Sequence, residues 1–276
     1  MIEYILTWAR RQPVFAFYIL AFVITWLGWI PQAAHSHGFF PFDSPLFYVF
    51  GGIGPLVAAL IVASALYGKR NGEEVFKPLW YWRVGIVWYI VALCGSIAIM
   101  LTSVCLKGEL AQGLARLTPS FALILTFLKY LLAAIPEEVA WRGFVLPRLQ
   151  SHYSALISSL IVGFLWALWH LPLLFIKGSI MATYPLIPFF LGTIASAILY
   201  TWLYNNSSGS VLIVTIFHAV SNTVGPSAGP EQTFVLILLA IIIVISFGPS
   251  HLSRRGKRIV RKDWLSPRGE AEDNLK

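Results

Sequence analysis

The sequence has 276 residues, of which 58% are hydrophobic and only 12% are charged. An ordinary soluble domain carries about 25% charged residues, so the composition excludes a soluble globular protein and indicates a chain embedded in lipid. The formal net charge of +8 does not indicate a nucleic-acid partner, because most Lys and Arg residues lie in short segments beside apolar runs, where they orient a membrane protein. Cys94 and Cys105 share one such run, about 16 Å apart if it is helical, which excludes a disulfide between them.

The apolar runs predict the fold class. A transmembrane helix needs about 20 residues to cross roughly 30 Å of hydrocarbon, and runs of this length predict an all-α polytopic membrane protein of about eight helices in one bundle. The first run follows Arg10 and Arg11 as in a signal peptide, but it is too long and lacks a clean cleavage site, so we expect an uncleaved span. The expected spans cover residues 14–34, 46–67, 84–106, 120–146, 155–176, 185–204, 210–225 and 232–249.

The charges of the connecting segments predict the orientation. Lys and Arg residues are retained on the cytosolic side of short loops. With the N-terminus inside, sixteen basic residues fall on the cytosolic side and three outside, so we expect a multi-pass protein of the cell membrane with both termini in the cytosol. The cytosolic set is Arg10, Arg11, Lys69, Arg70, Lys77, Arg83, Arg142, Arg148 and the eight basic residues after position 253, and the outer set is Lys107, Arg116 and Lys177.

The fourth span places three charged residues in or at the edge of the apolar layer. Glu138 and Arg142 stand at i and i+4 with the acid first, the favourable order for a helical ion pair. Glu137 lies about 100° further round the helix, so it has a different neighbourhood and is free for chemistry. Pro136 is expected to kink the helix. The alternative is that the two acids cap the start of a cytosolic helix with Pro136 in its first turn.

The fifth and seventh spans carry further polar groups. His170 is the ionisable residue of the fifth span, and Trp166 lies one turn before it on the same face. His218 and Asn222 stand at i and i+4 in the seventh span, so their side chains project toward a common point. Either site has a structural alternative, a hydrogen-bonded buried histidine for His170 and a clamp between helices for the His218 and Asn222 pair.

Polar groups in three apolar spans are hard to attribute to coincidence, and we expect them to converge. A carboxylate, a solitary histidine and a pair of neutral donors fit the hydrolysis of an amide. In that chemistry the carboxylate acts as general base for water, the histidine orients the water, and the donors stabilise the tetrahedral oxyanion.

The same residues resemble the family of CaaX proteases and bacteriocin-processing enzymes (the CPBP family), which includes the type II CaaX prenyl endopeptidases. The resemblance rests on Glu-Glu-x-x-x-Arg at 137–142 and His-x-x-x-Asn at 218–222, over roughly residues 118–225. Trp166 stands where the family usually has Phe before His170. The resemblance implies an eight-helix membrane core in which Glu137 and His170 activate water and His218 and Asn222 hold the oxyanion. Glu138, Arg142 and Trp166 would support these four.

The resulting hypothesis is an intramembrane endopeptidase, without a cofactor, whose site opens toward the cytosolic half. Its substrate would be a membrane protein or peptide, and a prenylated CaaX protein, a secreted precursor or a signalling protein would each fit. Zinc held by His170, His218 and a glutamate is the alternative mechanism, although no His-Glu-x-x-His motif is present. A transporter or an immunity protein that binds a peptide or ion is the alternative of another class.

The end of the chain differs from the rest. We expect a membrane-embedded bundle at residues 1–252, with its catalytic core at about 118–225, and a basic cytosolic tail at 253–276. Segment 254–262 holds six basic residues in nine. Each basic residue near a membrane surface is attracted by about 1 kcal/mol, so we expect anionic lipids to bind the tail.

Overall fold

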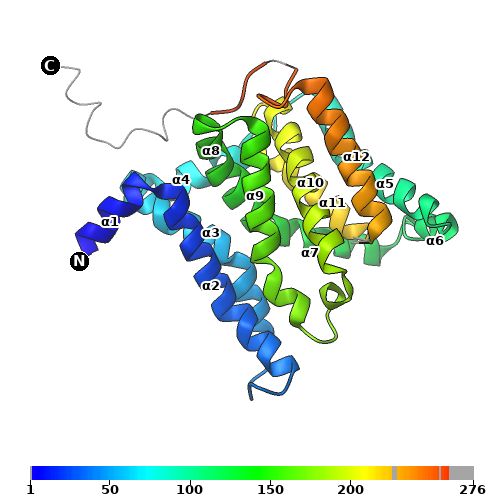
Figure 1. Cartoon of the computed structure of the whole chain (residues 1–276), viewed down its shortest axis with the longest axis horizontal. Helices are drawn as coiled ribbons and strands as arrows, with labels where there is room; N and C mark the ends of the chain where they lie inside the picture. The colour runs from blue at the N-terminus through cyan, green and yellow to red at the C-terminus, as the bar shows by residue number, and fades with distance from the viewer. Residues whose placement is uncertain (1, 226–228, 255, 261–276) are drawn as a thin grey trace.

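A computed structural model describes residues 2–225, 229–254 and 256–260 of the chain. The described residues form helices and contain no strand, which confirms the all-α class (Figure 1). The α-helices are α1 (Ile2–Arg11), α2 (Pro13–Ser36), α3 (Pro45–Tyr67), α4 (Asn71–Phe76), α5 (Ile86–Leu106), α6 (Leu110–Ala115), α7 (Phe121–Glu138), α8 (Leu146–His152), α9 (Ala155–Trp169), α10 (Leu186–Asn206), α11 (Val211–Thr223) and α12 (Pro230–Phe247). Short helical segments are η1 (Gly68–Arg70), η2 (Lys77–Trp80), the π-helix η3 (Val139–Val145), η4 (Leu171–Phe175) and η5 (Ile180–Thr183).

All eight expected spans coincide with helices. Six described helices, α2, α3, α5, α9, α10 and α12, are long and apolar enough to cross a membrane when the adjoining η1 and η4 are included. The chain is therefore a multi-pass membrane protein. The helices in the other two expected spans are not both long and apolar enough to cross a membrane. Helix α7 carries Lys129, Glu137 and Glu138 within its 18 residues. Helix α11 has only 13 residues, about 20 Å of helix.

Where a kink at Pro136 was expected, the structure has a π-helix that follows shortly after it. Helix α7 runs through Pro136 to Glu138 and then widens into η3. The alternative in which the two acids begin a helix is wrong, since they end α7. The structure also moves Arg142 from a cytosolic edge to the interior, where it is fully buried in η3.

Helices α2 and α3 pack face to face through small residues. A Cβ atom on Gly28 would lie 2.6 Å from the carbonyl oxygen of Phe47, so only glycine permits this approach. A Cβ atom on Gly54 would collide with the hydroxyl oxygen of Thr25 on α2. Close backbone approach through small residues is how helices associate in lipid, where the hydrophobic effect does not drive them together.

The ends of the helices define two poles of the bundle (Figure 1). At the first, here called the basic pole, α3, α8, α10 and α12 end and α9 and α11 begin. The amide of Asn205 at the end of α10 donates to the carbonyl of His251 after α12, which ties two of these ends together. At the opposite pole α2 and α9 end, and the amide of Lys177 donates to the hydroxyl of Ser36. Figure 1 shows α1, α4 and α8 toward the basic pole and the turns after α2 and α9 toward the other.

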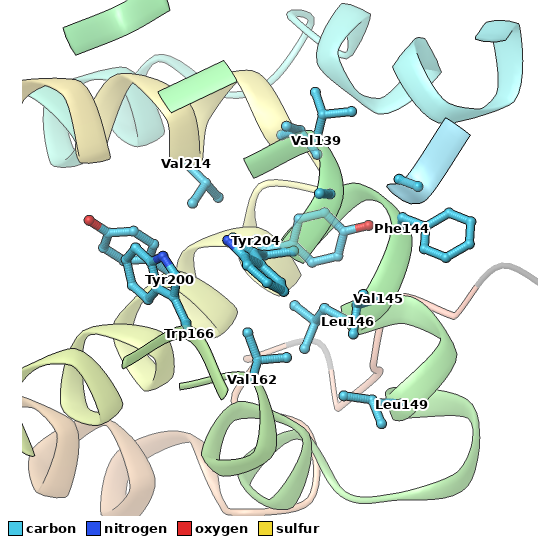
Figure 2. Close-up of a cluster of buried hydrophobic side chains, with 14 of the residues drawn as sticks. Val139, Phe144, Val145, Leu146, Leu149, Val162, Trp166, Tyr200, Tyr204 and Val214 are labelled. Atoms are coloured by element: carbon cyan, nitrogen blue, oxygen red, sulfur yellow. The ribbon is translucent and has the colours of Figure 1, made fainter. Parts of the chain in front are cut away.

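The core of the bundle surrounds η3. Figure 2 shows large side chains of η3 and α8 meeting side chains of α9, α10 and α11. Phe144, Val145 and Leu146 are completely buried there, and so are Tyr204 of α10 and Val214 of α11. Large apolar side chains also cover the outer faces of the spans, as expected where helices face lipid.

Candidate active site

Glu138 is the centre of a buried ion cluster. Its Oε1 atom accepts a hydrogen bond of 2.9 Å from Arg142 and one of 2.8 Å from Nδ1 of His218. Glu138 and Arg142 are completely buried, and His218 is 5% exposed. The Glu138–Arg142 ion pair predicted from the sequence is confirmed. The bond between Glu138 and His218 was not foreseen, because nothing in the spacing of residues 80 positions apart indicates it.

Aromatic rings enclose the guanidinium of Arg142. It lies 4.5 Å from the ring centroid of Trp166 and 4.6 Å from that of Tyr200, so it is held between rings from α9 and α10. Cation–π contacts are strengthened where water is excluded. Arg142 therefore joins α9 and α10 to the glutamate cluster. Sequence reasoning missed Tyr200, for which its place as a tyrosine within an apolar span was the available signal.

Glu137 has the separate neighbourhood that its position on the helix predicts. The indole Nε1 of Trp166 donates a hydrogen bond of 2.7 Å to its Oε2 atom. Glu137 is half-buried and lines a cavity, whereas Glu138 is fully enclosed. One glutamate is thus part of the framework, and the other faces space that a substrate can enter.

His170 is placed where α9 turns into η4. Its Nδ1 lies 2.8 Å from the carbonyl oxygen of Trp166. A carbonyl oxygen only accepts, so Nδ1 carries the hydrogen, and in the neutral ring Nε2 has a lone pair. Trp169 packs edge-on against the imidazole at 4.5 Å between centroids, which fixes the ring plane.

The four predicted catalytic residues line one cavity. Glu137 of α7, His170 after α9, and His218 and Asn222 of α11 face a space of about 300 Å³, the lower end of the size range of ligand pockets. The expected convergence of these groups is confirmed. Their catalytic roles stay predictions, because proximity alone does not show catalysis. Trp166 and Tyr200 form further parts of the wall.

The rest of the cavity wall is apolar or neutral. Phe189 and Leu236 contribute apolar surface, and Ser196, Thr193 and Thr233 contribute hydroxyl groups. Among the described residues, no three His, Cys, Asp or Glu side chains gather as a group that could hold a metal ion. The proposed zinc ligands His170 and His218 reach the same cavity but do not form such a group.

The cavity wall extends toward the opposite pole. There its lining includes Ile180, Met181 and Tyr184 in the connection between α9 and α10, together with Gln232 near the start of α12. The expected cytosolic termini and the expected opening of the site toward the cytosolic half both stay predictions.

Comparisons with known proteins agree on one family. Residues 119–224 match the model of the Rce1-like type II CAAX prenyl endopeptidases. The chain is also 26% identical over 255 residues to CAAX prenyl protease 2 of Methanococcus maripaludis, an alignment that covers 83% of this chain and 92% of that protein. The segment that matches the family model contains Glu137, His170, His218 and Asn222.

Proposed function

We propose that the chain, which is similar to the Rce1-like CAAX prenyl endopeptidases, is an intramembrane endopeptidase of that type with Glu137 as its general base. The substrate is a membrane-associated protein or peptide. The observation that carries the proposal is that a carboxylate, two imidazoles and an amide from three separate parts of the chain line one cavity.

In the proposed reaction, water lies between Glu137 and His170. The lone pair on Nε2 of His170 accepts one hydrogen of the water and orients it, while the carboxylate of Glu137 takes the other proton. The hydroxide formed attacks the carbonyl carbon of the peptide bond. The proton held by Glu137 then passes to the leaving amine as the C–N bond breaks, which restores the carboxylate.

The oxyanion of the tetrahedral intermediate is stabilised by Asn222 and His218. The amide of Asn222 is a neutral donor. Nδ1 of His218 is occupied by the carboxylate of Glu138, so its contribution comes through Nε2 of the protonated ring, which donates from both nitrogens. Glu138 and Arg142 thereby act on the reaction through His218, and Trp166 through Glu137.

Glu137→Gln tests the general base. We expect the variant to fold and to lose peptide cleavage, because it keeps the shape of the side chain and removes the basic oxygen. Glu138→Gln is the matched comparison. It unpairs Arg142 and His218 in the interior, where breaking a buried ion pair costs about 3–5 kcal/mol, so its thermal unfolding midpoint should fall as well. Cleavage by purified Glu137→Gln at the wild-type rate would contradict the proposal.

The alternatives predict different results in the same assay. A zinc enzyme would lose activity after exhaustive treatment with a strong chelator and regain it with stoichiometric zinc, because a metal that activates water is needed at each turnover. The glutamate mechanism expects activity to persist when metal analysis shows the enzyme to be empty. A transporter or an immunity protein would bind peptide without cleaving it, and binding would survive Glu137→Gln.

A further inference from the structure

Another cavity lies at the basic pole, between the first turns of α2 and of α9. Its volume is about 440 Å³, and its lining comes from the corner between α1 and α2, the end of α3, α8 and α9. We call it the basic cavity, after Arg10, Arg11 and Arg148 in its lining. Of the described residues, none lines both this cavity and the one that contains Glu137. The basic cavity is therefore a separate site.

The cavity exists because α2 and α9 are in contact away from this pole and separated at it. The indole Nε1 of Trp26 donates a hydrogen bond of 3.1 Å to the carbonyl oxygen of Trp169, and the ring of Trp29 packs on that of Trp169 at 4.5 Å between centroids. These contacts join the second half of α2 to the end of α9. Nearer to α1 and α8, both helices line the cavity instead (Figure 1).

Two arginines of the cavity are held in place by hydrogen bonds. Arg148 is only 3% exposed, and it donates 2.6 Å to the carbonyl oxygen of Phe144 and 2.7 Å to the hydroxyl of Tyr67. The Nε atom of Arg10 donates 2.8 Å to the carbonyl oxygen of Ala65 near the end of α3. A guanidinium has five N–H groups, so this bond leaves the terminal groups of Arg10 to donate to a ligand.

The charge of the lining is positive. Of the described residues that line the cavity, three are arginines and none is Asp or Glu. Arg258 adds a further positive charge at the edge, where it donates to the carbonyl oxygen of Tyr153. Orientation in the membrane requires basic residues at the ends of the spans, but it does not require that one of them be buried in a cavity wall. An anion in the cavity would gain charge-assisted hydrogen bonds, which are the strong ones.

The apolar part of the lining distinguishes a lipid from a soluble anion. Phe15 of α2 and Ile161 and Leu165 of α9 lie on two helices that are apolar enough to cross a membrane. Phe15 is 59% exposed and Tyr153 is 47% exposed, so the lining reaches the outer surface of the molecule. Basic pockets between transmembrane helices bind lipid head groups. A free phosphate ion would leave the apolar wall without a partner, whereas an acyl chain covers it.

We propose that the basic cavity binds one anionic glycerophospholipid, with its phosphate group at the three arginines and one acyl chain along the apolar residues of α2 and α9. The bound lipid fills the space between the two helices and joins the corner between α1 and α2 to α8. The inference depends neither on the proposed function nor on the side of the membrane to which the basic pole faces.

Titration with lipid tests the role of the arginines. The full chain is purified in an uncharged detergent, and the probe is phosphatidylglycerol with a fluorescent acyl chain. Arg10→Gln with Arg11→Gln changes two exposed residues and should leave the fold intact. We expect its affinity to fall by about tenfold or more, because hydrogen bonds to a charged phosphate are lost. The control is Lys77→Gln with Arg83→Gln, which removes two charges from exposed positions between α4 and α5, outside the lining, and should bind as the wild type does.

Competition distinguishes the sources of the phosphate group. Unlabelled phosphatidylglycerol should displace the probe, phosphatidylcholine with the same chains should do so at least tenfold less well, and inorganic phosphate in large excess should not. Ile161→Trp, which fills the apolar part of the cavity and keeps the arginines, should also weaken binding of the probe. Displacement by inorganic phosphate would identify a site for a soluble anion and overturn the lipid. Equal affinity for the two lipids, or unchanged affinity in Arg10→Gln with Arg11→Gln, would overturn the proposed site.

Photocrosslinking separates the cavity from the basic tail and from lipid that merely surrounds the spans. The probe is phosphatidylglycerol with a diazirine in one acyl chain, and the modified peptides are identified by mass spectrometry. We expect adducts within residues 14–18 and 161–165 that disappear with excess unlabelled phosphatidylglycerol. Adducts confined to the segment around 254–262 would assign binding to the tail and overturn the inference. Adducts spread evenly over the outer faces of the spans would also overturn it.

Discussion

Trp166 donates a hydrogen bond that the phenylalanine of the resembled motif cannot make. Its Nε1 atom lies 2.7 Å from Oε2 of Glu137, and its ring covers Arg142. Trp166→Phe removes the donor and keeps an aromatic ring. A hydrogen bond to a charged group contributes about 1.5–3 kcal/mol, and 1.4 kcal/mol is a factor of ten in rate.

We therefore expect Trp166→Phe to lower kcat about tenfold, with KM and the unfolding midpoint near those of the wild type, because the bond holds Glu137 toward the reacting water. Steady-state kinetics and thermal unfolding in detergent measure these quantities. Trp166→Leu, which also removes the ring from Arg142, should lose stability in addition. An unchanged kcat in Trp166→Phe would show that the indole does not position the base.

Asn222 gives a second prediction for a single side chain. If its amide donates mainly to the charge of the transition state, Asn222→Ala lowers kcat by about 10²–10³ and leaves KM nearly unchanged. Asn222 is half-buried and lines the cavity, so its removal should cost little stability. A loss of folded protein with normal kcat in the remainder would favour the clamp between helices instead.

The hydroxyl group of Thr25 connects the packing of α2 against α3 to the candidate active site. Thr25 of α2 donates to the carbonyl of Gly51 on α3 at 2.8 Å and accepts 2.7 Å from the indole of Trp169. Trp169 in turn packs against His170. A side chain on Gly54 would collide with the Thr25 hydroxyl and come within 3.0 Å of its backbone nitrogen. The spacing between the two helices thus determines the position of His170.

Gly54→Leu should separate α2 from α3. Overpacking of this kind costs about 1–3 kcal/mol, so we expect a lower unfolding midpoint and, through Thr25 and Trp169, a lower kcat. Gly52→Leu is the matched control, because nothing lies within 4 Å of a Cβ at that position. It should retain the stability and kcat of the wild type. Equal effects of the two substitutions would contradict the packing argument.

The sequence predicts the helices of this fold better than the transitions and contacts between them. Apolar length locates the spans, and the i to i+4 spacing identifies the Glu138–Arg142 pair, because both depend on local geometry. The π-helix η3 depends on how the chain packs after Pro136, and helix α1 is short and outside the apolar runs. The bond from His218 to Glu138 joins two helices, so it follows from tertiary packing that no local pattern encodes.

At the scale of the molecule, charge and cavity together restrict the function. The site residues are predictable from sequence, whereas the direction in which their cavity opens is not, because it depends on which ends of α9, α10, α11 and α12 surround it. Once that geometry is known, the orientation of the chain decides whether a cytosolic or an exported peptide meets Glu137. Topology is therefore a functional property of this enzyme.

The orientation can be measured with reporters fused at two positions. We expect a reporter after Lys276 to be active in the cytosol and one inserted at His37 to be active outside, because His37 lies at the opposite pole, where its Nε2 is 2.9 Å from the carbonyl of Phe175. The basic residues retained in the cytosol are the physical reason. An insertion beside Lys69, in the exposed turn after α3, should report the cytosol as Lys276 does. A cytosolic signal at His37 would contradict the orientation predicted from the basic residues.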